Sequence, residues 1–248
     1  MSFPEFTRFA HQRLTCNTPM GPQRLVAILD VLALEGSERV VDVGCGVGEF
    51  SLKLAEHGGV SVVGLDPDTH ALAEAEARRE RRGLRGEVEF LETTAADFFS
   101  EPRQADLVVC LGVQHAFGSF EAMLDLVAGS LSPGGRVWIG DGYWRGELDP
   151  AYEAFLGGVK DRATFEDRVR SAVDRGWTPL YASEVSLDEW DQFEWAFFRV
   201  AESYARLHPD DPRAAELLEK RTAWRDAYLR WGRGVMGFGY FILRRPED

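Results

Sequence analysis

Apolar residues in the first 143 positions alternate between a helical spacing and short continuous runs. Leu25, Ile28, Leu29 and Leu32 recur at intervals of three and four residues, which predicts an amphipathic helix that begins near Pro22. Further helices are expected over residues 49–56, 69–82 and 120–131, and buried strands over residues 40–43, 60–65, 88–91, 105–111 and 136–140. This alternation of strand and helix is typical of right-handed crossovers in a doubly wound, mostly parallel α/β sheet.

The pattern changes near Trp144 and predicts a mostly helical region followed by a last strand. Helices are expected over residues 150–159, 164–175, 186–207 and 211–232, and strands over residues 178–183 and 235–243. Ser186-Leu187-Asp188-Glu189 is a capping-box sequence, and Asp211-Pro212 has the cap-then-proline form of a helix start. Six of the seven tryptophans lie in this half, so the helices must bury a large aromatic area against the sheet or around a ligand.

The charge of the chain argues against a nucleic-acid partner. Subtracting 41 acidic from 28 basic residues gives a net charge of −13, and a polyanion would approach against that field. Arginines 78, 79, 81, 82 and 85 form a basic run, which we interpret as a solvated helix face. Hydrophobic residues make up 45% of the chain, which is enough for a packed core.

Cysteine usage and hydropathy indicate a cytoplasmic protein. The three cysteines are too few for a disulfide framework and fit no zinc-site spacing. Residues 1–14 include charged side chains and lack the apolar stretch of a signal peptide. No apolar run reaches the roughly 18 residues that a membrane span needs, so we expect no membrane partner.

A glycine-rich turn joins the first predicted strand to the helix that follows it. The sequence Asp42-Val43-Gly44-Cys45-Gly46-Val47-Gly48 leaves the strand, and its glycines permit a tight turn and a close approach of a ligand. The helix N-terminus behind it offers free N–H groups and a positive dipole end. A dinucleotide fingerprint would place its third glycine at position 49, where this chain has Glu49, and a carboxylate there would disfavour a pyrophosphate.

An acidic residue follows the second strand. Asp66 stands 22 residues after Gly44 (66 − 44), at the end of Val63-Gly64-Leu65. A carboxylate at this position accepts hydrogen bonds from the 2′,3′-diol of a ribose and repels a 2′-phosphate. The loop and the acid together therefore favour a nucleoside ligand without a pyrophosphate.

These motifs resemble the class I S-adenosylmethionine (SAM)-dependent methyltransferases. The D-x-G-x-G-x-G loop, Asp66 and Leu131-Ser132-Pro133-Gly134-Gly135 match the family pattern over about residues 20 to 143. A looser likeness to little-characterised bacterial small-molecule methyltransferases rests on Ala10-His11, Asn17-Thr18-Pro19-Met20, Gly140-Asp141-Gly142-Tyr143-Trp144 and Glu189-Trp190-Asp191-Gln192-Phe193-Glu194-Trp195. The resemblance implies a Rossmann-like seven-stranded sheet with a helical insertion or lid toward the C-terminus.

The resemblance also implies where the cofactor binds. The implied contact residues are Asp42, Gly44, Cys45, Gly46, Gly48, Asp66, Thr94, Ala95, Ala96, Asp97, Leu111 and Gly112. The glycines would pass under the methionine part and ribose of SAM, Asp66 would hold the ribose diol, and Leu111-Gly112 would face the amino acid part. Many relatives have an acid where this chain has Thr94, so either Asp97 or a backbone carbonyl is expected to contact the adenine.

Candidate catalytic residues follow the fourth and fifth strands. Methyl transfer requires alignment above all, and a base only where the acceptor must lose a proton. His115 is our candidate base, although an ordinary loop histidine is an equal alternative. Tyr143 is a second candidate and, with Trp144, a wall of the acceptor pocket, with plain packing as its alternative. The five histidines show no metal-ligand spacing, so no metal is expected.

Carboxylates and large aromatics alternate in one predicted helix. Glu189, Trp190, Asp191, Glu194 and Trp195 would suit a cationic amine acceptor through ion pairing and cation–π contact. We favour the simpler interpretation of a buried aromatic stripe beside a solvated acidic face.

Taken together, we expect a SAM-dependent methyltransferase that acts on a small molecule and releases S-adenosylhomocysteine. Residues 1–143 would form the N-terminal segment and SAM-binding core, residues 144–234 the acceptor-binding region or lid with one core strand, and residues 235–248 the final strand. The alternatives are a non-catalytic SAM-binding regulatory subunit and, less favoured because of Glu49, an NAD-dependent oxidoreductase. The sequence leaves open the acceptor, the acceptor atom and the oligomeric state.

Overall fold

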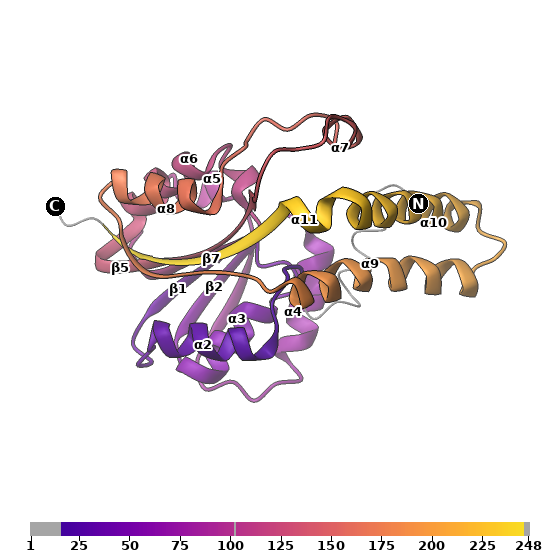
Figure 1. Cartoon of the computed structure of the whole chain (residues 1–248). Helices are drawn as coiled ribbons and strands as arrows, with labels where there is room; N and C mark the ends of the chain where they lie inside the picture. The colour runs from indigo at the N-terminus through magenta and orange to yellow at the C-terminus, as the bar shows by residue number, and fades with distance from the viewer. Residues whose placement is uncertain (1–15, 102, 246–248) are drawn as a thin grey trace.

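A seven-stranded sheet runs through the part of the chain that the computed structural model describes, residues 16–101 and 103–245 (Figure 1). Its strands are β1 (Arg39–Val43), β2 (Ser61–Asp66), β3 (Val88–Glu92), β4 (Ala105–Leu111), β5 (Leu131–Trp144), β6 (Thr178–Glu184) and β7 (Met236–Arg244). They lie in the order β3-β2-β1-β4-β5-β7-β6. Strands β1 to β5 pair in parallel, and β7 is antiparallel to both β5 and β6. The predicted mostly parallel, Rossmann-like α/β sheet is confirmed.

Helices cover both faces of the sheet. They are α2 (Pro22–Leu32), α3 (Glu49–Gly58), α4 (Thr69–Arg79), α5 (Ala95–Phe98), α6 (Phe120–Ser130), α7 (Pro150–Phe155), α8 (Phe165–Asp174), α9 (Leu187–Leu207), α10 (Pro212–Ala227) and α11 (Arg233–Val235), with a 3₁₀ turn η1 (Gln114–Ala116) and a π turn η2 (Tyr228–Gly232). One apolar core lies between the sheet and α5, α6 and α8, and a second lies on the face covered by α2 and α3 (Figure 1). Burial on both faces agrees with the apolar runs that predicted the strands.

Several predicted boundaries were wrong. Strand β5 begins at Leu131 and ends at Trp144, so Tyr143 and Trp144 lie in the strand and not after it. The cause is long-range pairing, because Leu131 pairs with Ala105 in β4 and Trp144 pairs with Met236 in β7. Helix α7 ends at Phe155, short of the predicted residue 159, since glycines 157 and 158 take left-handed φ angles of 78° and 95°.

The predicted long helices form a hairpin that projects beyond the sheet (Figure 1). The capping box is present, since Ser186 Oγ accepts a hydrogen bond from the Glu189 backbone N–H, and the Glu189 side chain accepts one from the Ser186 N–H. Phe197, Val200 and Ala201 of α9 pack against Ala214 and Leu217 of α10. The hairpin thus has a small apolar core of its own, and only its base adjoins the sheet.

A buried ion pair fixes the base of this hairpin to the N-terminal half. Arg24 of α2 donates from Nε and Nη2 to the Glu189 carboxylate at 2.8 and 2.7 Å, and both side chains are about nine-tenths buried. Glu189 also accepts from the Gly21 backbone N–H at 3.0 Å. These bonds hold the pKa of Glu189 at about 2, against the opposing effect of burial. Residues 21–24 and the start of α9 are therefore one connected unit.

Glu189→Gln is expected to lower the free energy of unfolding at neutral pH by about 2–4 kcal/mol, because Arg24 loses its buried counter-charge. The folded-state pKa lies below the ordinary value of 4.5, so the contribution of Glu189 is complete above that pH and is lost as the pH falls toward about 2. Urea unfolding at neutral and mildly acidic pH measures both effects.

The matched control is Glu202→Gln on the same helix. Glu202 forms an exposed pair with Arg206 at 3.8 Å, and its loss should change stability by less than about 0.5 kcal/mol. Equal losses in the two variants would show that the Arg24–Glu189 pair does not anchor the hairpin.

Candidate functional site

The carboxyl ends of the parallel strands form one edge of the sheet. Strand register places Val43 beside Leu65 on one side and beside Cys110 on the other. The residues that follow these positions, Gly44, Asp66 and Leu111, therefore stand next to one another. Most predicted cofactor contacts are brought together at this edge, where open α/β sheets bind ligands.

The glycine loop is held by two kinds of constraint. Gly44, Gly46 and Gly48 all have left-handed φ angles, of 65°, 54° and 74°. A Cβ on Gly44 would lie 2.4 Å from Val113 Cγ1, and one on Gly48 would lie 2.6 Å from Phe90 Cζ. A Cβ on Gly46 would meet nothing within 4 Å. The outer glycines are thus required by packing, whereas the middle one leaves open space above the loop.

Asp66 is fixed beside that open position. Its Oδ2 accepts a hydrogen bond from the Gly46 N–H at 2.9 Å, and its Oδ1 accepts one from the Asp68 N–H at 2.8 Å. A carboxylate has about four acceptor sites, so each oxygen retains capacity for a further donor. The side chain is half-buried and can present that capacity to a ligand over the loop.

Asp42 lies under the loop and is buried. Its Oδ2 accepts a hydrogen bond from Ser51 Oγ of α3 at 2.6 Å. Burial raises the pKa of Asp42 to about 7, and the negative charge of Asp66 adds to the rise. Cys45, which the sequence also placed in the site, has a thiol whose pKa is raised by burial, so it is uncharged at neutral pH.

The segment after β3 forms the start of α5. Thr94 caps this helix by accepting from the Asp97 N–H at 3.1 Å, and its hydroxyl donates to Asp97 Oδ2 at 2.7 Å. Asp97 and Ala96 are exposed, whereas Ala95 is buried. The Asp97 carboxylate is one of the two expected adenine contacts, and one of its oxygens already accepts the hydrogen bond from Thr94.

The end of β4 is covered by the chain just before α2. Gly112 has a φ of 73° and donates its N–H to the Gly140 carbonyl at 2.8 Å. A Cβ added to it would lie 3.8 Å from Thr18 Cγ2, and Thr18 and Pro19 are buried. The motif Asn17-Thr18-Pro19-Met20 signalled this segment through family likeness, but its position on Gly112 was not predicted. Ala10 and His11 lie outside the described residues.

His115 and Tyr143 occupy different surroundings. His115 is exposed in η1, next to Gln114, which donates to Asp161 at 3.2 Å. Tyr143 is 5% exposed, packs against Gly237 and donates its hydroxyl to the Glu184 carboxylate. Burial and that hydrogen bond raise the pKa of Tyr143 to about 12, which makes it a poor base at neutral pH.

A buried charge network at the end of β5 was not predicted. Arg168 of α8 contacts Asp141 at 3.1 Å and Asp161 at 2.6 Å, and it donates to the Gly142 carbonyl at 3.2 Å. Burial raises the pKa of Asp141 to about 6, although Arg168 opposes the shift. Because Gln114 also binds Asp161, this network joins the turn that carries His115 to α8 and β5. Gly140-Asp141-Gly142 was a signal for it, but nothing in the sequence identified Arg168.

Two sequence interpretations change with the structure. Glu49 is buried at the start of α3, where Arg82 Nη2 lies 2.6 Å and Lys53 Nζ 3.4 Å from its carboxylate, so its charge is already paired. The arginine run is accordingly only partly solvated: Arg78 lies 3.7 Å from Glu49 and is 14% exposed. Both findings arise because Arg78, near the end of α4, and Arg82, just after it, reach the Glu49 carboxylate.

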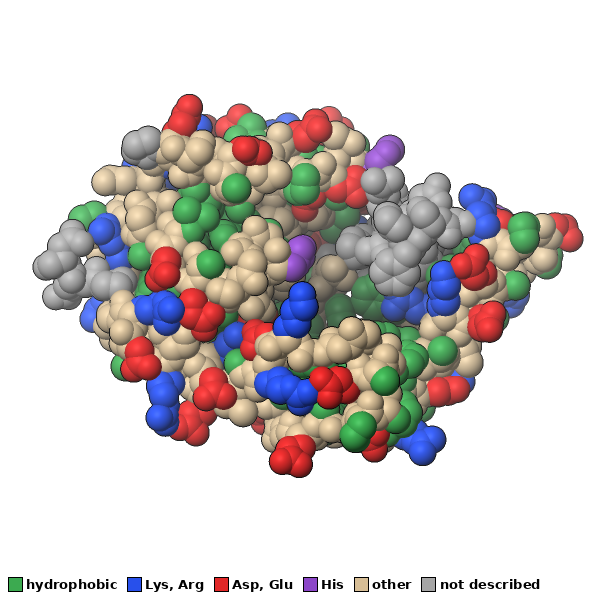
Figure 2. All heavy atoms as spheres, turned by 90° about the horizontal axis from the view of Figure 1, so that it is seen from above, with side chains coloured by type: hydrophobic (Ala, Val, Ile, Leu, Met, Phe, Trp, Pro, Cys, Tyr) green, Lys and Arg blue, Asp and Glu red, His purple; other side chains and the backbone are tan. Residues whose placement is uncertain are grey.

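The described residues contain no cluster of His, Cys, Asp or Glu side chains that could hold a metal ion. Within the same residues, no helix is long and apolar enough to cross a membrane. Seen from above, hydrophobic and basic side chains lie beside a depression near the middle of the surface (Figure 2).

Comparison with known proteins shows that this chain is similar to methyltransferases. Residues 40–135 match a family model described as a methyltransferase domain. A SAM-dependent methyltransferase from Geobacter sulfurreducens, solved in complex with S-adenosyl-L-homocysteine, aligns over 97% of this chain and 98% of its own, with 26% identity and a TM-score of 0.87. A second, from Thiobacillus denitrificans and also in complex with S-adenosyl-L-homocysteine, aligns over 98% and 99% of the two chains, with 25% identity and a TM-score of 0.88. The uncharacterised protein YjhP of Escherichia coli is 27% identical over 98% of this chain and 99% of its own.

The loop geometry predicts different costs for two glycine substitutions. Gly46→Ala should lower the free energy of unfolding by about 1–2 kcal/mol, because only the left-handed backbone is strained. Gly48→Ala should cost about 1–3 kcal/mol more, because its Cβ also crowds Phe90 and Ala75. Urea unfolding of both variants in the absence of ligand checks this order, and equal losses would contradict it.

Proposed function

We propose that the chain is a class I SAM-dependent methyltransferase and that it moves the methyl group of SAM to a small-molecule acceptor by in-line displacement. It is an enzyme that uses SAM and forms S-adenosylhomocysteine. One observation in this chain carries the cofactor assignment. Asp66 accepts a hydrogen bond from the Gly46 N–H, and a Cβ added to Gly46 would have no atom within 4 Å, so there is space for a ligand above the loop. A β-carbon at Gly46 would fill that space, so the residues present fit the cofactor.

Each part of the strand-end edge has a role in this proposal. Gly44, Gly46 and Gly48 would underlie the methionine part and ribose, and Asp66 would accept from the ribose diol with its remaining acceptor sites. Leu111 and Gly112 would face the amino acid part. Asp42 and Cys45 would support the loop from below, and the segment Thr94, Ala95, Ala96 and Asp97 would flank the adenine.

SAM supplies a methyl group on a sulfonium, which already activates the carbon for attack. The work left to the chain is to align the acceptor in a dry site, and this is worth several kcal/mol of the barrier. His115, exposed at the end of β4, would take a proton from an acceptor that must lose one. Tyr143 and Trp144 would wall the acceptor side, and residues 144–234 would form the acceptor-binding region.

Two observations support a small-molecule acceptor. The net charge of −13 repels nucleic acid, and hydrophobic side chains lie beside the depression near the middle of the surface (Figure 2). A non-catalytic SAM-binding subunit would share the cofactor edge but would form no S-adenosylhomocysteine with any acceptor.

Calorimetric titration with S-adenosylhomocysteine should show micromolar binding, and titration with NADH should show none. Asp66→Ala should weaken S-adenosylhomocysteine by about tenfold or more, because two charge-assisted hydrogen bonds to the ribose are lost. Glu92→Gln is the control, since Glu92 is an exposed carboxylate opposite Asp66 in the register of β2 and β3. Unchanged affinity in Asp66→Ala would remove Asp66 from the cofactor site.

Formation of S-adenosylhomocysteine should be detected with members of a small-molecule panel and not with total RNA. With an acceptor that must lose a proton, His115→Ala should lower kcat by about 100-fold or more and leave S-adenosylhomocysteine affinity unchanged. His57→Ala is the matched control, because His57 is an exposed histidine at the far end of α3. Full activity of His115→Ala would exclude the catalytic role, and turnover with RNA alone would overturn the proposed acceptor class.

A further inference from the structure

The short turn η1 lies directly beside the glycine loop. It follows Gly112 and Val113, and Val113 lies so close to Gly44 that a Cβ on that glycine would be 2.4 Å from Val113 Cγ1. Two backbone hydrogen bonds of 2.9 Å close the turn. A 3₁₀ turn of three residues has poor hydrogen-bond geometry, so contacts from outside the turn are needed to fix its position.

The side chain of Gln114 makes such a contact. Its Nε2 donates to Asp161 Oδ2 at 3.2 Å, although the two residues are 47 positions apart in the chain. Gln114 is half-buried, whereas the next residue, His115, is exposed. The turn is thus attached to the glycine loop through Val113 and to Asp161 through Gln114.

Asp161 is held in place by the end of β5. Its Oδ1 accepts from the Ala163 N–H at 3.0 Å, and its backbone carbonyl accepts from Trp144 Nε1 at 2.9 Å. The Trp144 N–H donates in turn to the Ala163 carbonyl at 2.9 Å. Burial would raise the pKa of Asp161, but hydrogen bonds from Ala163, Arg168 and Gln114 hold it below its ordinary value. Asp161 is therefore a charged and well-anchored acceptor for Gln114.

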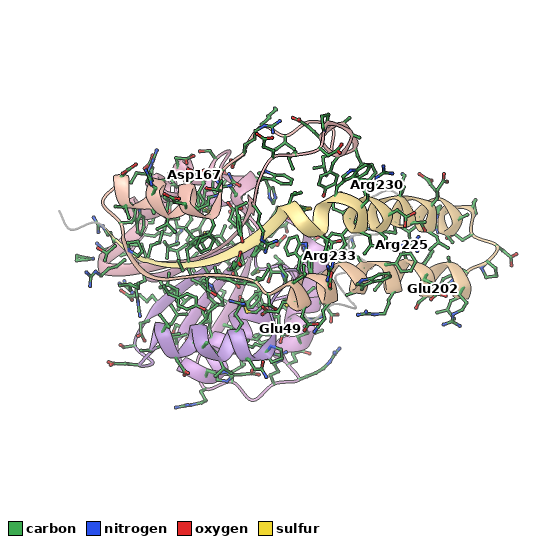
Figure 3. The ribbon with its side chains drawn as sticks, viewed as in Figure 1. Glu49, Asp167, Glu202, Arg225, Arg230 and Arg233 are labelled. Atoms are coloured by element: carbon green, nitrogen blue, oxygen red, sulfur yellow. The ribbon has the colours of Figure 1, made fainter. Side chains whose placement is uncertain are left out.

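The sequence after Asp161 brings α8 back onto this carboxylate. Thr164 Oγ1 accepts from the Asp167 N–H, and the side chain of Asp167, which is labelled in Figure 3, accepts from the Thr164 N–H. This capping box satisfies backbone donors at the helix start and so fixes where α8 begins. The next residue, Arg168, places its Nη2 2.6 Å from Asp161 Oδ2.

Arg168 is itself anchored by β5 and α6. Its Nη2 lies 3.1 Å from Asp141 Oδ2 and 3.2 Å from the Gly142 carbonyl oxygen, and its guanidinium carbon lies 4.9 Å from the centre of the Phe120 ring. Arg168 is 5% exposed, so the two carboxylates stabilise a cation that burial alone would disfavour. A continuous set of contacts therefore leads from the buried end of β5 through Arg168 and Asp161 to the turn.

We propose that Gln114, Asp161 and Arg168 are positioning residues that hold η1 against the glycine loop in the arrangement that binds the cofactor. They act through Val113, which packs on Gly44, and through the adjoining end of β4. A loosened turn would spend part of its time in positions that do not bind, and the apparent affinity falls by that fraction. This inference rests on the proposed function, because it adds residues to the cofactor edge described there.

The test removes the bond between Gln114 and Asp161 and leaves the buried network intact. Gln114→Ala removes the donor, and Gln114→Glu keeps the shape of the side chain but places a second carboxylate against Asp161. Both should weaken S-adenosylhomocysteine by about three- to tenfold in calorimetric titration, which is the effect of one hydrogen bond on an equilibrium. Gln114→Lys restores a donor and should bind as the unaltered protein does.

The matched control is Gln192→Glu on α9. Gln192 is an exposed glutamine that donates to Asp188 at 2.7 Å, so the substitution makes the same chemical change away from the strand ends. Its affinity for S-adenosylhomocysteine should equal that of the unaltered protein.

Two further measurements separate positioning from a general loss of stability. The midpoint of urea unfolding should not change in Gln114→Ala, whereas the ¹⁵N order parameters of amides 113–116 should fall from about 0.85 toward 0.6. Asp161→Ala should weaken S-adenosylhomocysteine as well, and adding Gln114→Ala to it should cause no further loss, because both residues act through one bond.

Unchanged affinity in both Gln114→Ala and Gln114→Glu, an equal loss in Gln192→Glu, or additive losses in the double variant would each overturn the proposal. Absence of S-adenosylhomocysteine binding in the unaltered protein would instead overturn the cofactor edge. The order parameters test the attachment of the turn in either case, and unchanged values in Gln114→Ala would show that Gln114 does not hold it.

Discussion

The direction of β7 is the constraint on which the rest of the molecule depends. Strands β1 to β5 run one way, and β7 enters the sheet from their carboxyl ends because it is antiparallel to β5. The chain must therefore reach that edge before β7 begins, and η2 and α11 deliver it there. Strand β6, also antiparallel to β7, brings α9 to the same edge. Strand direction alone thus brings the base of the hairpin to the same edge of the sheet as the glycine loop.

Sequence reasoning succeeded where the controlling physics is local. The glycines of the loop, the apolar strands and the two marked starts of the hairpin helices depend on neighbours within a few residues, and the structure has them where they were expected. The mostly parallel, doubly wound arrangement followed from handedness rules that need no side chains. The position of Asp66 beside Gly46 required only that parallel strands end together.

Sequence reasoning failed where residues far apart in the chain determine the structure. Nothing near Arg24 indicates that it is buried against Glu189, and nothing near Arg168 indicates Asp141 and Asp161. The true length of β5 depends on β7, which lies about a hundred residues later in the chain. The acidic helix was interpreted as one solvated face, but tertiary packing gave each of its carboxylates a different partner. Such pairings are set by tertiary contacts, so they produce no periodic pattern of residues in the sequence.

The Arg24–Glu189 bond joins residues 165 positions apart, and it has a consequence for how the chain is made. A ribosome releases the glycine loop and the first five strands long before α9, and β6 cannot join the sheet until β7 lies between it and β5. The N-terminal half can collapse early around its parallel strands, but Arg24 stays without its partner until the hairpin is complete. Long-range contacts of this kind slow folding. The Arg24–Glu189 pair can therefore form only after the nine-residue strand β7 has joined the sheet.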